Sequence, residues 1–97
     1  MKKYIDVGLA DKWIIGKVQQ ESHRQISKWG FQIHSVFEWL TYTTEELGSL
    51  AKAISENEYR NGSKEKVVSE AVQVATLALK IAKMFELDSF EKEEKCP

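Results

Sequence analysis

Acidic residues at two places in the chain could together hold a divalent cation. The first set is Glu45-Glu46, and the second is Glu70 with Gln73 three residues later. Carboxylate and amide oxygens are hard ligands of the kind that Mg²⁺ requires, and the ion usually leaves positions for water and phosphate. The sequence therefore predicts a magnesium site, provided that the segments carrying the two sets lie side by side.

Glu70 stands out because it heads an apolar stripe. At about 100° per residue, its nearest neighbours on a helix are Val74, Leu77 and Ile81. A buried carboxylate without a partner costs several kcal/mol, so Glu70 would need a cation or a hydrogen-bond donor. The alternative is that Glu70 lies in the first turns of its helix, where the helix dipole favours a negative charge and solvent stays close. Periodicity alone leaves both interpretations open.

Acidic residues also share one face of the preceding predicted helix. Glu38, Glu45 and Ser49 are spaced by seven and four residues, and Glu46 lies beside them. Such a face is ordinarily a solvated polar surface. It becomes a candidate site only if it faces the helix of Glu70, because oxygens from both helices would then converge on one point. The opposite face of the same helix carries apolar or small residues: Phe37, Leu40, Thr44, Leu47, Ala51 and Ile54.

Three helices are expected to position these residues. Hydrophobic periodicity predicts them over about residues 9–28, 35–55 and 64–85. Residues 1–8 are predicted to form an extended arm, and residues 86–97 a charged tail that forms a short helix or a frayed end. The sequence thus predicts an all-α fold, a helical bundle of three main helices with short terminal segments.

Local signals mark the ends of the predicted helices. Gly30 ends the first helix, and Ser35 with Glu38 forms a capping box at the start of the second, in which each side chain bonds the other residue's backbone amide. Asn61-Gly62 predicts the turn before the third helix. The third helix is apolar over an unusually wide arc between Val67 and Phe85, which two other helices cannot cover. We therefore expect self-association, as a homodimer or a homotetramer.

Composition narrows the functional classes. A chain of 97 residues suffices for a single domain, residues 1–97. The formal net charge is -1 with acids and bases interleaved, which argues against binding of a nucleic acid polymer, and no run approaches the roughly 20 apolar residues that span a membrane. Cys96 is the only cysteine, and no secretory signal is present, so we expect a cytoplasmic protein. His23 and His34 lack the spacing of zinc ligands.

Taken in order, the motifs resemble those of the MazG-like nucleotide pyrophosphohydrolases. That family carries Glu-Glu-x-x-Glu on one helix and Glu-x-x-Asp on the next, which together hold Mg²⁺. Here residues 45–49 read Glu-Glu-Leu-Gly-Ser, and residues 70–73 read Glu-Ala-Val-Gln. Upstream, residues 28–34 read Lys-Trp-Gly-Phe-Gln-Ile-His, which is similar to one branch of the family that also uses Gln at the last motif position. The resemblance covers roughly residues 20–85.

The resemblance implies a Mg²⁺-dependent hydrolase that converts a nucleoside triphosphate into a monophosphate and pyrophosphate. The implied metal ligands are Glu45, Glu46 and Glu70, and Gln73 is a weaker ligand or orients water. The ion would neutralise phosphate charge, and a metal-bound or carboxylate-held water would be the nucleophile.

Three further residues are candidates for holding the substrate. Trp29 could stack on a base of any kind, or pack in the core or an interface. Lys28 and Lys52 could contact phosphates, although solvated surface explains them as well.

The sequence departs from the family pattern at Ser49, where relatives carry Glu, and at Gln73, where most carry Asp. Together these changes remove two negative charges from the expected metal site. The alternative to an enzyme is therefore a degenerate relative, a non-catalytic nucleotide-binding or structural oligomer. A third possibility is an unrelated helical interaction protein, for which the ordered motifs would be a coincidence.

Overall fold

The computed structural model shows three helices over the residues that it describes, 2–5 and 12–95, with side chains as far as residue 87. All regular structure in this part is helical: α1 Lys12–Trp29, α2 Val36–Tyr59 and α3 Lys64–Lys95. The prediction of an all-α fold with three main helices is confirmed. Among the described residues, no helix combines the length and the apolar character needed to cross a bilayer.

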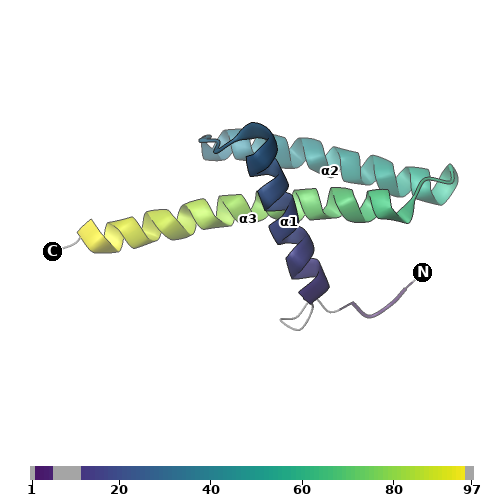
Figure 1. The fold of residues 1–97 in the computed structure, drawn as a ribbon, viewed down its shortest axis with the longest axis horizontal. Coiled ribbons are helices and arrows are strands. Elements are labelled where there is room, and N and C mark those ends of the chain that lie inside the picture. The colour runs from purple at the N-terminus through teal and green to yellow at the C-terminus, as the bar shows by residue number, and fades with distance from the viewer. Residues whose placement is uncertain (1, 6–11, 96–97) are drawn as a thin grey trace.

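α3 is the element that both other helices contact. α2 runs beside it in the opposite direction, and α1 crosses it steeply (Figure 1). The arrangement is elongated, with extents of 58 × 29 × 23 Å and a radius of gyration of 16.2 Å. A compact chain of this length would have a radius of gyration of about 12.5 Å. In Figure 1 the C-terminal half of α3 projects well beyond α2, which accounts for much of this length.

The helix bounds differ from the predicted ones mainly at the C-terminal ends. α2 continues about one turn past the predicted end at residue 55, to Tyr59. α3 continues through most of the predicted tail to Lys95, because the Glu and Lys residues of this segment are good helix formers and no proline interrupts them. Residues 2–5 of the predicted arm form neither helix nor strand. The rest of the arm, and residues 9–11 of the first predicted helix, lie outside the described residues.

The predicted capping box is present at the start of α2. The backbone amide of Glu38 donates to Ser35 Oγ at 3.2 Å, and the amide of Ser35 donates to Glu38 Oε1 at 3.0 Å. These two bonds satisfy amides that have no partner within the helix. The helix start, and with it the axial position of every acidic residue on α2, is thus set by a local sequence signal.

The turn between α2 and α3 needs glycine at position 62. Its amide donates to the carbonyl of Glu56 at 2.9 Å, and its own carbonyl accepts from Asn57 Nδ2 at 2.8 Å. A Cβ added at Gly62 would lie 3.0 Å from the carbonyl carbon of Glu56, closer than ordinary packing allows. Asn61 before it adopts a positive φ of 61°, which asparagine tolerates. The tight turn therefore brings α3 back along α2.

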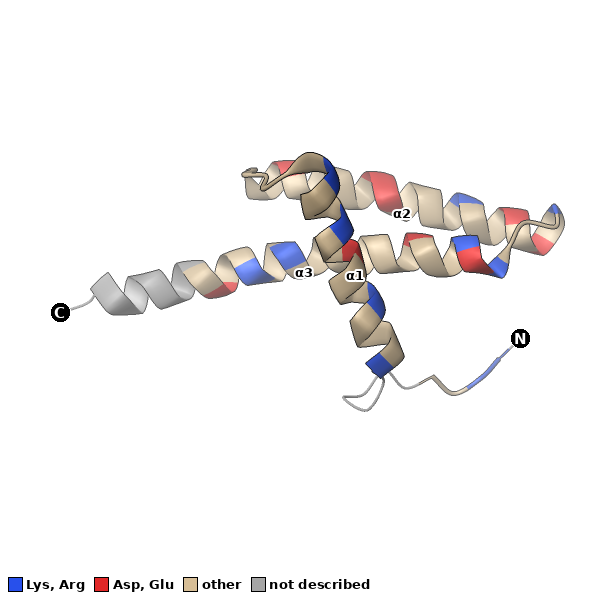
Figure 2. Cartoon of the chain, in the orientation of Figure 1, with Lys and Arg blue, Asp and Glu red and all other residues tan. Residues whose placement is uncertain are grey.

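The buried core is small and unusually polar. Among the residues whose side chains are described, its apolar members are Trp39, Ala53 and Leu77, whereas Glu21, Gln25, Glu70 and Thr76 are buried as well. In Figure 2 the described part of each helix carries both acidic and basic residues. A core in which polar groups are as prominent as apolar ones needs hydrogen bonds and ion pairs to hold the helices in register.

The inward face of α2 is not its most apolar face. Trp39 and Ala53 are buried, and Glu46 between them is half-buried. The apolar residues grouped by periodicity point away from α3 and are exposed; we call them the outer stripe, made of Phe37, Leu40, Thr44, Leu47, Ala51 and Ile54. Helical spacing correctly groups these residues, but it does not determine which face meets the neighbouring helix.

Two glycine variants should change stability in opposite directions. Gly62→Ala should lower the free energy of unfolding by about 1–3 kcal/mol, because the new methyl group meets the backbone of Glu56. Gly16→Ala, in a helical position where a Cβ meets nothing within 4 Å, should raise it by about 0.5–1 kcal/mol. Urea denaturation of both variants and the wild type measures these differences in the free energy of unfolding. Equal effects of the two substitutions would contradict the tight turn.

Candidate active site between the helices

Glu46 of α2 and Glu70 of α3 meet where these antiparallel helices pack. Partial burial raises the pKa of Glu46 above its usual value, and hydrogen bonding to Glu70 and the negative charges of Glu70, Glu21 and Glu45 raise it further. Glu70 is only 5% exposed. The sequence required the two acidic helices to lie side by side, and for this pair of carboxyl groups the structure meets that requirement.

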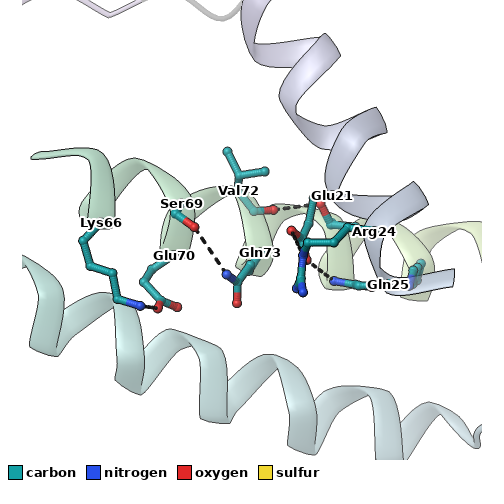
Figure 3. A network of polar contacts seen from close by, with 10 residues as sticks. Glu21, Arg24, Gln25, Lys66, Ser69, Glu70, Val72 and Gln73 are labelled. Atoms are coloured by element: carbon teal, nitrogen blue, oxygen red, sulfur yellow. Dashed lines mark hydrogen bonds and ion pairs between the residues drawn. The ribbon is translucent and has the colours of Figure 1, made fainter. Parts of the chain in front are cut away.

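Glu70 has one satisfied and one unsatisfied oxygen. Its Oε1 accepts from Lys66 Nζ at 2.8 Å, one turn earlier on α3 (Figure 3). Its Oε2 is buried and has no hydrogen-bond partner among the described residues. A bond to the carboxyl group of Glu46 needs a proton on one of the two, so when both are ionised this oxygen stays unsatisfied. Of the two interpretations that periodicity left open, burial excludes the solvated one, and the cation that Glu70 contacts within the chain is Lys66.

α1 contributes a third carboxylate, Glu21, which the sequence analysis did not identify. Burial opposes its ionisation, but hydrogen bonds from Arg24 and Gln25 and the charges of Arg24 and Lys80 outweigh burial and hold the pKa of Glu21 below its usual value. Arg24 Nε and Nη2 donate to the two carboxylate oxygens at 2.8 and 2.7 Å, and Gln25 Nε2 donates at 2.8 Å (Figure 3). The only signal in the sequence was that Arg24 and Gln25 follow Glu21 by three and four residues, a spacing that lets side chains meet on a helix.

The polar contacts of Glu21 continue to α3. Gln25 Oε1 accepts from Lys80 Nζ, and this ammonium also lies 5.1 Å from the ring centre of Trp39. Burial lowers the pKa of Lys80, and the negative charge of Glu21 partly opposes this effect. The three residues Glu21, Gln25 and Lys80 therefore connect α1 to α3 through polar groups, in a position that also contacts α2.

A pocket with a volume of about 260 Å³ opens beside Glu46. Side chains from all three helices line it, including Glu45, Glu46, Gln73, Trp29, Trp39 and Tyr42. Its volume is slightly below the range typical of ligand pockets, but it combines aromatic walls with a few converging polar groups, which is their usual composition. A larger cleft of about 450 Å³ lies between α1 and the start of α3, and neither Glu46 nor Glu70 lines it.

Aromatic rings form two sides of this pocket. His34 packs edge-to-face on Trp39 and Tyr42, with ring centres 4.8 and 5.1 Å apart. Trp29 of α1 also lines the pocket and is 51% exposed, with Lys28 Nζ 4.9 Å and Arg24 Cζ 5.5 Å from its ring centre. Such rings offer flat apolar surface for a base or a similar planar group.

The structure brings together only part of the predicted site. Glu45, Gln73 and Trp29 line the same pocket as Glu46, and Glu70 lies against Glu46. Lys28 covers the ring of Trp29 but does not line the pocket, and Lys52 is exposed on α2 away from it. The residues that sequence reasoning missed, besides Glu21, are Lys66 beside Glu70, Arg24, and the aromatic wall of His34, Trp39 and Tyr42.

The carboxyl pair has the donor atoms that Mg²⁺ prefers, but few of them. Within the described part of the chain, no three His, Cys, Asp or Glu side chains are grouped closely enough to hold a metal. Mg²⁺ is, however, usually bound through one or two carboxylates together with phosphates and water. Glu46 and Glu70 supply two carboxylates, and Oε2 of Glu70 is a buried oxygen without a hydrogen-bond partner in the described part of the chain. The donor set fits Mg²⁺, with fewer protein ligands than the full family motif provides.

Glu46→Gln should stabilise the metal-free protein at neutral pH. Because the folded state raises the pKa of Glu46 above 4.5, folding stability falls as pH rises from that value through the raised pKa. An uncharged Gln removes this loss of stability. With a chelator present, the melting temperature of Glu46→Gln should therefore exceed that of the wild type at neutral pH, and the difference between them should vanish toward pH 4.5. Glu45→Gln serves as the control. A lower melting temperature for Glu46→Gln at neutral pH would refute the close carboxyl pair.

The assignment of this site rests on its own residues and geometry. The acidic pair, the polar contacts of α1 and the aromatic pocket are all observed in one chain. Comparisons with protein-family models, with curated proteins and with solved structures found no match.

Proposed function

We propose that the chain is a Mg²⁺-dependent nucleoside triphosphate pyrophosphohydrolase of the MazG-like type, acting as a cytoplasmic enzyme. The observation that carries the proposal is the convergence of Glu46 and Glu70 from two antiparallel helices, with a buried carboxylate oxygen of Glu70 that has no partner in the described residues. Two carboxylates with an unsatisfied oxygen favour a divalent cation, and the adjoining aromatic pocket favours a base.

The residues around the pocket have different roles in the proposed reaction. Glu46 and Glu70, with Gln73 nearby, would hold Mg²⁺, which would neutralise the negative charge of the phosphates. Trp29 would stack on the base, and Arg24, the only Arg or Lys among the pocket-lining residues described, would contact the phosphate chain. Glu45 lines the pocket next to Glu46 and would accept a proton from the attacking water. Water then bonds to the α-phosphorus as pyrophosphate leaves.

A non-catalytic relative is the second candidate, and specific observations favour it. Ser49 carries no charge, and its hydroxyl only donates to the carbonyl of Glu45 at 3.4 Å. Lys66 already neutralises one oxygen of Glu70. Such a protein would keep the helical scaffold and the pocket, and would bind a nucleotide without cleaving it.

Glu70→Gln tests the proposed metal site. With Mg²⁺ present, pyrophosphate release should be measured for a panel of ribo- and deoxyribonucleoside triphosphates. The wild type should cleave at least one of them, and Glu70→Gln should reduce that rate about 100-fold or more, because a carboxylate that clamps the cation is lost. Glu65→Gln is the matched control, an exposed carboxylate on the same helix. Equal Mg²⁺ binding by Glu70→Gln and wild type in calorimetry would exclude the ligand role.

Ser49→Glu distinguishes a weakened enzyme from a non-catalytic relative. The substitution restores a carboxylate one turn after Glu45 and Glu46, on the same stretch of helix surface. It should lower the melting temperature without metal, because like charges are crowded, and increase the stabilisation produced by Mg²⁺. Ser27→Glu on α1 adds the same charge outside the pocket and should show neither effect. If Ser49→Glu changes neither Mg²⁺ dependence nor hydrolysis relative to an inactive wild type, the non-catalytic alternative holds.

A further inference from the structure

The outer stripe of α2 has the spacing of a helix–helix seam. Its six residues follow one another at alternating intervals of three and four, from Phe37 to Ile54. This is the heptad pattern of positions a and d in coiled coils. The four large side chains are 75%, 52%, 54% and 51% exposed for Phe37, Leu40, Leu47 and Ile54. A seam of this kind normally packs against another helix, and none of the described helices of this chain covers it.

The exposed surface of the chain is large enough to include such an interface. Its solvent-accessible surface is 8206 Å², whereas a compact monomer of 11.2 kDa would expose about 5,700 Å². A stable interface of standard size needs about 800 Å² from each partner. The excess is larger than this area, and the outer stripe contributes to it together with the projecting C-terminal half of α3.

We propose that two copies of this chain pair through their outer stripes, with the two α2 helices antiparallel and the two-fold axis passing between residues 45 and 46. An antiparallel pair sets each a position against a d position of the other helix. In this register Phe37 faces the partner's Ile54. The two remaining kinds of layer set Leu40 against the partner's Ala51, and Thr44 against the partner's Leu47.

Side-chain volume selects this register. Leu40 and Leu47 each face a small residue of the other helix, so the layers are filled without overlap. A shift by one heptad in one direction leaves Phe37 without a facing layer and sets Glu58 against the partner's Leu40. A shift in the other direction leaves Ile54 without a facing layer. Only the proposed register uses all six positions of the stripe within α2.

Gly48 fits the same interface. It lies in the middle of α2 beside the stripe, where an added Cβ would meet nothing within 4 Å in this chain. Glycine inside a helix costs about 0.5–1 kcal/mol relative to alanine, and packing within the chain gives no reason for it. Beside a helix–helix seam, the absence of a side chain lets the second backbone approach closely.

Charge favours the antiparallel direction. Glu38, Glu45 and Lys52 are spaced by seven residues and form one row beside the stripe, acidic in the first half of α2 and basic in the second. The proposed register brings Lys52 level with residue 39 of the other copy, next to the partner's Glu38. A parallel pair would instead set each acidic residue beside its own copy, and would align the two helix dipoles unfavourably.

The first test is the mass in solution. Sedimentation of the wild type at micromolar concentration should give twice 11.2 kDa. Leu47→Glu should remain helical by circular dichroism and raise the dissociation constant of the dimer about 100-fold or more, because a charge enters the centre of an apolar seam. Leu79→Glu is the matched control, since Leu79 on α3 is 55% exposed against 54% for Leu47, and it should stay dimeric. A monomeric wild type, or a dimeric Leu47→Glu, would overturn the proposal.

Crosslinking tests the register, in a Cys96→Ser background. The double variant Leu40→Cys with Ala51→Cys should form a covalent dimer on mild oxidation, linked between positions 40 and 51 of different chains. The same two positions of one helix are about 16 Å apart along its axis, too far to link within a chain. Neither single variant should crosslink. A covalent dimer of Leu40→Cys alone would show a parallel pair and refute the proposed arrangement. These outcomes are independent of whether the protein hydrolyses nucleotides.

Discussion

Two carboxyl groups, those of Glu46 and Glu70, face each other across the seam of α2 and α3, where apolar side chains ordinarily lie. Partial burial raises the pKa of Glu46, and the neighbouring Glu70 raises it further. Lys66 offsets one of the charges from the exposed side, through a contact of 2.8 Å with Glu70. The electrostatic repulsion that remains destabilises the metal-free protein. A polar seam of this kind departs from ordinary core packing, and such departures are expected where a site has a function.

The crossing of α1 over α3 depends on a second set of polar contacts. Glu21 and Gln25 of α1 are buried, and Lys80 of α3 donates to Gln25. Hydrogen bonds have directional requirements that apolar contacts lack, so this set specifies one crossing geometry. Lys80 also lies over the ring of Trp39, which lines the pocket. The orientation of α1, which carries Trp29 and Arg24, is thereby tied to the pocket wall on α2.

Local signals made much of the fold predictable from the sequence. The capping box at Ser35 and the turn at Gly62 each depend on a few neighbouring residues, and both are present. The motifs on two successive helices predicted a site of Glu45, Glu46, Glu70 and Gln73 on the condition that these helices lie side by side. The short turn at Gly62 makes the helices antiparallel neighbours, and Glu46 is the member of the first motif that meets Glu70. The inward face of α2 was not predictable in this way, since periodicity groups residues on a face without identifying the helix that it meets.

Contacts between residues far apart in the sequence could not be predicted from it either. Gln25 and Lys80 are 55 positions apart, and no local pattern in the sequence indicates that α1 crosses α3 at this level. The i, i+4 spacing of Lys66 and Glu70, by contrast, was readable as a possible ion pair. Its importance became clear only with the burial of Glu70, which depends on the packing of α2.

Both faces of α2 belong to one rigid helix, so any movement of the helix displaces both. The inner face carries Glu46, and the outer stripe lies on the opposite side of the same rigid helix. Within the described residues the fully buried apolar groups on the inner face are Trp39 and Ala53, so the packing of α2 on α3 includes few of them. In the proposed dimer the outer stripe adds apolar contacts that limit how far each α2 can slide or rotate. A cation bound between Glu46 and Glu70 would restrict the same motions from the inner side. Pairing of the chains and binding of the cation would favour the same position of α2, so each would promote the other to the same extent. Pairing of the chains would therefore strengthen cation binding, and cation binding would strengthen pairing.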